Sequence, residues 1–75
     1  MDWQPHIKAT AEIMGGVPCI AGTRIPVSVV LDNLAAGLTG PELIVQYPTL
    51  SEPAIRAAIA YAAELTRERV VALPA

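Results

Sequence analysis

The stretch that most constrains the fold is residues 15–26, which read Gly-Gly-Val-Pro-Cys-Ile-Ala-Gly-Thr-Arg-Ile-Pro. Its adjacent glycines and Gly22 adopt positive φ angles at little cost, whereas Pro18 and Pro26 fix φ and remove backbone donors. Such residues interrupt regular structure, so the stretch separates an N-terminal arm from the rest of the chain. It predicts a structural turn, because it lacks the Gly-x-x-x-x-Gly-Lys-Ser/Thr spacing of a phosphate-binding loop.

Length and composition predict one small domain, residues 1–75, that acts together with other chains. A chain of 75 residues buries only about 60% of the surface that its unfolded form exposes. Hydrophobic residues make up 53% and charged residues 16%, so some apolar surface is expected to face a partner. We therefore expect a homodimer or a complex. The net charge of −2 argues against a broad phosphate-binding surface.

A single cysteine, Cys19, excludes an intramolecular disulfide and is typical of a reducing compartment, so we expect a cytoplasmic protein. No stretch has the features of a signal peptide, and none approaches the roughly 18 apolar residues of a membrane span. We therefore expect no membrane association. One His and one Cys without clustered carboxylates cannot complete a metal site, and no cofactor is expected.

Residues 1–25 are predicted to form a β-like arm that includes the turn. The near-alternating residues 7–14 predict an extended strand, and residues 19–20 and 23–25 predict a short, broken second strand pairing with it. Because an isolated hairpin is marginally stable, this one should pack on helices or pair with the arm of a second subunit. Trp3, close to the N-terminus, is a candidate anchor for a partner chain.

Residues 26–69 predict three helices. Pro26 fits a first turn, an apolar face follows, and Gly37 ends the first helix; that face holds Val27, Val30, Leu31 and Leu34. Thr39 and Glu42 form a capping-box pattern for a second helix that ends near residue 46, because Pro48 follows. Ser51 is the expected N-cap of a third helix over residues 52–69.

The third helix carries two stripes of interest. We predict an apolar stripe facing the core, made of Ile55, Ala58, Ile59, Ala62 and Leu65. A second stripe of small residues between two guanidinium groups consists of Arg56, Ala60, Ala63 and Arg67. The alanines would let another backbone come close, and arginines bind carboxylates or phosphates.

A short helix, a turn and a longer helix resting on the first helix have the order of a tri-helical helix-turn-helix. If the third helix entered the major groove, the residues nearest to DNA would be Glu52, Ala54, Arg56, Ala57 and Arg67. The alternative is a three-helix scaffold that does not bind DNA. The residues by themselves favour the scaffold, since recognition helices usually carry more Lys, Arg, Asn and Gln.

Arg24, Cys19 and His6 are the remaining side chains that could carry chemistry. Arg24 is expected to bind backbone carbonyls or a helix C-terminus, with presentation to a partner as the alternative. Cys19 is expected to be a small buried hydrophobe, because the only histidine, His6, lies in the arm. We therefore do not expect an enzyme.

The residues of the turn also carry a family resemblance. The string from residue 15 to residue 27, with Leu-Ala-Ala-Gly at 34–37, Tyr47-Pro48 and the helix at 55–62, resembles the DUF433 family over residues 7–64. The signature-turn positions of the match are Gly15, Gly16, Pro18, Gly22, Thr23, Arg24 and Pro26. The chain departs from the family at Val17, often Lys in relatives, and at Thr10-Ala11, where an Asp-Pro turn is usual. Losing that proline should make residues 7–14 a more continuous strand.

The resemblance implies a mainly α, homeodomain-like helix-turn-helix and an antitoxin-like function. Many members of the family look like antitoxins encoded beside a PIN-like ribonuclease, which they would bind and neutralise while repressing their own operon through operator DNA. Expected partner-binding residues are Trp3, Ala60, Ala63, Val70, Val71 and Leu73, the last three in the tail at 70–75. The alternative is a protein-interaction adaptor with the same fold and no DNA binding. No catalytic residue follows from the resemblance.

Overall fold

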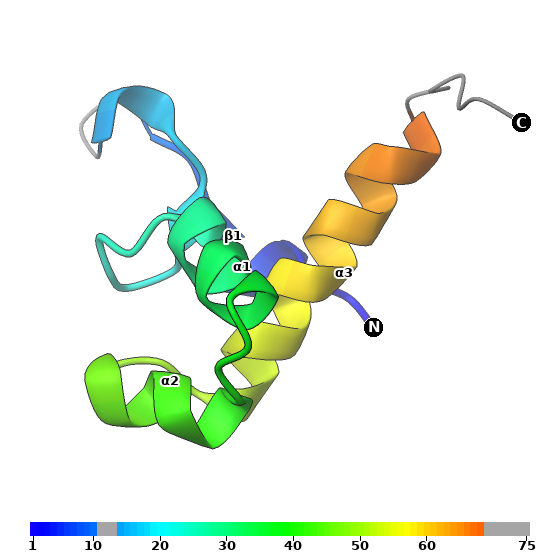
Figure 1. Ribbon diagram of the computed structural model, residues 1–75. Coiled ribbons are helices and arrows are strands. Elements are labelled where there is room, and N and C mark those ends of the chain that lie inside the picture. The colour runs from blue at the N-terminus through cyan, green and yellow to red at the C-terminus, as the bar shows by residue number, and fades with distance from the viewer. Residues whose placement is uncertain (11–13, 69–75) are drawn as a thin grey trace, which may run out of the picture.

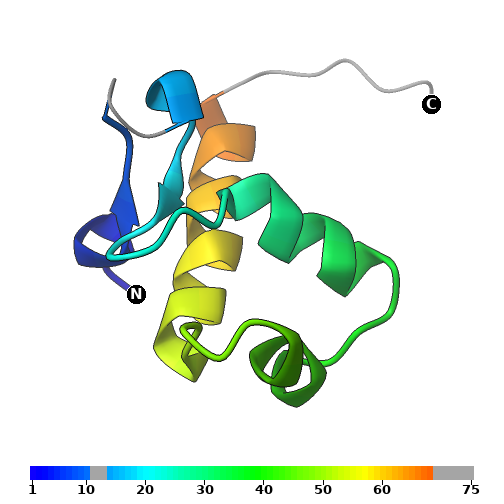
Figure 2. The ribbon, with the colours of Figure 1, turned by 90° about the vertical axis from the view of Figure 1, so that its left-hand side faces the viewer.

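A computed structural model describes residues 1–10 and 14–68 (Figure 1). The fold is mainly helical with a two-stranded antiparallel hairpin, as predicted. Figure 1 shows β1, α1 and α2 on the same side of α3, and Figure 2, viewed from that side, shows the hairpin and α1 in front of α3 with α2 below them. In chain order the elements are η1 (Gln4–His6), β1 (Ile7–Lys8), η2 (Met14–Gly16), β2 (Cys19–Ile20), α1 (Val27–Ala35), α2 (Gly40–Gln46) and α3 (Glu52–Glu68).

The hairpin is much shorter than predicted. Ile7 pairs with Ile20 and Lys8 pairs with Cys19, and β1 ends there. The expected strand over residues 7–14 is therefore wrong for residues 9–10 and for Met14, which lies in η2; residues 11–13 lie outside the described residues. Beyond Cys19 the second strand bonds to the start of α1 instead of β1, since Pro18 O accepts from Val27 N at 3.0 Å. The hairpin is therefore limited to two residue pairs.

Residues 23–25 do not pair with β1, which corrects the prediction of a broken second strand. They turn back onto β2 instead: Thr23 N donates to Ile20 O at 3.0 Å, and Ile20 N donates to Ile25 O at 2.9 Å. Gly22, with φ of 78°, is the third residue of this turn, where a type II turn needs a positive φ. The signature stretch is thus a structural turn, as expected.

Helix α1 begins after Pro26, its N-cap, and is joined to the hairpin by a hydrogen bond from Val27 N to Pro18 O at 3.0 Å. The helix ends as predicted at Gly37, whose φ is 102°. Gly37 N donates to Leu34 O and Leu38 N donates to Asn33 O, which is a Schellman motif.

The starts of α2 and α3 are confirmed in detail. Thr39 caps α2, with Glu42 N donating to Thr39 Oγ1 at 3.3 Å and Thr39 N donating to Glu42 Oε1 at 2.9 Å. Because the backbone N–H and the hydroxyl of Thr39 bond to the charged carboxylate, they lower the pKa of Glu42 below its ordinary value of 4.5. Ser51 caps α3, since Ala54 N donates to Ser51 Oγ at 3.2 Å.

The core lies where the first half of α3 meets α1, α2 and the hairpin. Val30, Leu43, Ala57 and Ala58 have no exposed surface. The alanines of α3 allow the neighbouring elements to come close, and half-buried side chains such as Trp3 and Tyr61 close the edges. The remaining buried members of the cluster are Ile7, Ile20, Val27, Leu50, Ala54 and Ile55.

The buried face of α3 is rotated from the predicted one. Ile59, expected in the core, is 50% exposed, whereas Ala54 and Ala57 are buried. The stripe that faces the bundle runs through positions 54, 57, 58, 61 and 65, which follow i, i+3, i+4, i+7 and i+11 spacing. Leu65 belongs to this stripe, yet it is 41% exposed, because α3 continues beyond the other helices (Figure 1).

Candidate partner-binding surface

The solvent-facing side of α3 carries the predicted stripe of small residues. Arg56 and Arg67 are exposed, and Ala60 and Ala63 between them are half-buried. These four residues are spaced i, i+4, i+7 and i+11, so they share one face of the helix. Ile59 lies next to them and is half exposed. The result is an apolar strip with a cationic side chain at each end.

Two of the five predicted DNA contacts are wrong. Ala54 is 5% exposed and Ala57 is fully buried, so neither side chain can reach a base edge. The prediction failed because it counted the first turns of α3 as solvent-facing, whereas α1 and α2 pack there. Glu52 and Arg56 are exposed, although a carboxylate oxygen of Glu52 lies beside Gly40, 3.1 Å from where a Cβ would stand on that glycine.

Arg67 is paired within its own helix. Its Nη1 lies 3.5 Å from Glu64 Oε2, and the two side chains are 74% and 47% exposed. An exposed pair at i, i+3 contributes little to stability and is screened by salt, so it can exchange for a carboxylate or phosphate of a partner.

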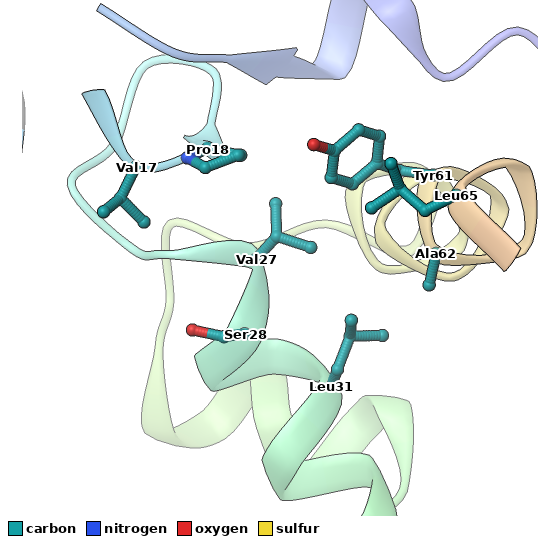
Figure 3. Close-up of a pocket in the computed structure, with 8 residues that line it drawn as sticks. All are labelled: Val17, Pro18, Val27, Ser28, Leu31, Tyr61, Ala62 and Leu65. Atoms are coloured by element: carbon teal, nitrogen blue, oxygen red, sulfur yellow. The ribbon is translucent and has the colours of Figure 1, made fainter. Parts of the chain in front are cut away.

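A second candidate surface is an open groove of about 220 Å³ between α1, α3 and the signature turn. Figure 3 shows Val27 and Leu31 of α1 opposite Tyr61 and Leu65 of α3, with Pro18 across the groove from Tyr61. The remaining lining residues are Val17, Ser28 and Ala62, and Ser28 is directed away from α3. The groove is therefore almost wholly apolar.

Trp3 does not extend freely from the N-terminus. Its ring centroid lies 4.8 Å from that of Tyr61, with the ring planes at 60°. The indole is half-buried and packs against the core. Tyr61 of the same chain thus supplies the apolar surface that we expected a partner chain to offer to Trp3.

In the signature turn, Thr23 has the most specific role: its hydroxyl donates to Ile20 O at 2.8 Å and accepts from Ile25 N at 3.0 Å.

Cys19 is 2% exposed and donates weakly to Val17 O at 3.4 Å, so it is the small buried residue that was predicted. Arg24 is exposed, and within residues 1–10 and 14–68 its side chain makes neither the expected hydrogen bond to a carbonyl nor an ion pair.

No group of three or more His, Cys, Asp or Glu residues is placed to hold a metal ion among the described residues. None of the described helices is both long enough and apolar enough to cross a membrane.

Comparison with known proteins shows which family this chain belongs to. The family described as "Protein of unknown function (DUF433)" matches residues 7–62, which hold both strands, the signature turn, α1, α2 and residues 52–62 of α3. The chain belongs to the DUF433 family. The matched region ends at Ala62, which lines the groove, so most of the groove wall lies inside the family region of this DUF433 protein.

Two relatives extend this result. The uncharacterized protein y4eO of Sinorhizobium fredii (strain NBRC 101917 / NGR234) is 36% identical over 56 residues, which are 75% of this chain and 25% of y4eO. The crystal structure of a DUF433 member from Anabaena variabilis is similar with a TM-score of 0.75 and 34% identity over 87% of this chain and 63% of that one. This DUF433 chain thus spans a quarter of y4eO and under two thirds of the Anabaena protein.

Sequence reasoning missed the groove of this DUF433 protein. The sequence predicts Ala62 and Leu65 in the core stripe of the third helix, and no pattern connects them with Val17 in the turn. The signal in the sequence was the adjacent apolar residues Val17 and Pro18 within the turn, since an apolar pair in a turn needs a surface to pack against. The predicted tail contacts Val70, Val71 and Leu73 lie outside the described residues.

Proposed function

We propose that this DUF433 protein is an antitoxin-like binding protein of the cytoplasm, which as a homodimer masks a PIN-like ribonuclease encoded beside it. It acts by binding and not by catalysis. Family membership and the antitoxin-like appearance of many members support this role. The exposed side of α3 supports it further, because it offers apolar contact area to a partner.

One observation carries the proposal: the strip on α3 combines exposed apolar surface with arginines at both ends. Ile59, at 50% exposure, adjoins the small side chains of Ala60 and Ala63, over which another chain can pack closely. Arg56 and Arg67 then stand where they can bind carboxylates at the rim of such a contact. Protein interfaces commonly combine an apolar centre with a polar rim of this kind.

Repression of its own operon is the second part of the proposal. The order of short α2, a turn and longer α3 fits a helix-turn-helix, and exposed Arg56 lies near the start of the second of those helices. With Ala54 and Ala57 buried, the DNA contacts reduce to Glu52, Arg56 and Arg67. So few cations favour operator binding by a dimer or a toxin complex over binding by one chain.

The first test is co-expression with the adjacent open reading frame, followed by pull-down and a growth assay. Capture of a toxic neighbour and rescue of growth are expected. Ile59→Glu should abolish capture because it places a charge in the apolar strip. Val45→Glu is the matched control, since Val45 is an exposed aliphatic residue of α2, and it should still bind. A neighbour that is neither toxic nor bound would refute the antitoxin function.

A mobility shift with the protein's own promoter DNA tests the operator. Arg56→Ala should weaken binding and lower the slope of log affinity against log salt by about 1 if Arg56 contacts one phosphate. Arg24→Ala removes the same charge from the signature turn and should leave the shift unchanged. Absence of any shift, with and without the captured neighbour, would favour the alternative function, a protein-interaction adaptor that does not bind DNA.

A further inference from the structure

We draw no further inference here: the strongest candidate, the open apolar groove between α1, α3 and the signature turn, carries none because nothing among the described residues shows what covers it.

Discussion

The indole of Trp3 packs against the ring of Tyr61 with centroids 4.8 Å apart, which joins the third residue of the chain to the middle of α3. The two residues are 58 positions apart in the sequence (61 − 3). The contact holds the arm against the last helix, because η1 and β1 both pack on α3.

Removing this aromatic pair should lower stability. Trp3→Ala loses half-buried apolar area and the ring contact, so we expect the free energy of unfolding to fall by roughly 1–3 kcal/mol. Trp3→Phe keeps a ring at the site and should cost less than about 1.5 kcal/mol. Urea unfolding followed by circular dichroism measures both. Equal losses for the two variants would show that the ring contact is unimportant.

Leu43 is the most demanding core position of α2. Its side chain has no exposed surface, so Leu43→Ala should reduce the free energy of unfolding by roughly 2–5 kcal/mol. A chain of 75 residues has a total of only about 4–11 kcal/mol, so the variant should be partly unfolded at moderate temperature. Val45→Ala, two positions away and 80% exposed, should change stability by at most about 0.5 kcal/mol. Thermal unfolding of the pair provides the comparison.

The capping box of α2 predicts a pH dependence. Folding lowers the pKa of Glu42, so its contribution to stability is fully present above the ordinary value of 4.5 and is lost as the pH falls through the lowered pKa. Glu42→Gln should remove this part of the acid destabilisation while it leaves the Thr39 hydroxyl bond in place. Thr39→Ala should cost about 1 kcal/mol near neutral pH. Urea midpoints measured from about pH 6 down to about pH 3 test both variants; identical pH profiles for the wild type and Glu42→Gln would contradict the prediction.

The turn at Gly22 should not tolerate a side chain. Nothing lies within 4 Å of an added Cβ there, so the cost of Gly22→Ala is that of its φ of 78° alone, roughly 1–2 kcal/mol. Gly40 provides the opposite case, because its φ is not positive and an added Cβ meets only the flexible carboxylate of Glu52 at 3.1 Å. Gly40→Ala should therefore change stability by less than about 0.5 kcal/mol. A neutral Gly22→Ala in the same unfolding assay would contradict this assignment.

Sequence reasoning predicted the features that local chemistry determines. The caps at Thr39 and Ser51 and the end of α1 at Gly37 follow from hydrogen bonds and φ angles within a few residues, and all three are confirmed. The predicted length of the hairpin was wrong because pairing depends on both strands, and beyond Cys19 the second strand bonds to α1, with Pro18 O accepting from Val27 N. The sequence of one strand alone does not show how many of its residues pair with the other strand.

The candidate site was less predictable than the fold, because helix faces depend on packing partners. Ala57, predicted to be exposed, is buried, and Ile59, predicted to be in the core, is 50% exposed. The reason is that α3 packs its alanines against the neighbouring elements. The groove needed Val17, Leu31 and Leu65 from three separate segments, and only the folded chain brings them together. The prediction that Arg56 and Arg67 share one exposed face of α3 is confirmed, because residues at this spacing lie on the same side of any α-helix.

The shortness of the hairpin has a consequence for how this chain behaves in a crowded solution. Long, flat outer strands present rows of unsatisfied amide and carbonyl groups onto which neighbouring molecules can assemble into aggregates. Here β1 and β2 each have two residues, Pro18 stands at one end of the ladder, and a tight turn begins at the other. The described part of the arm thus offers other molecules little backbone on which to nucleate a larger sheet.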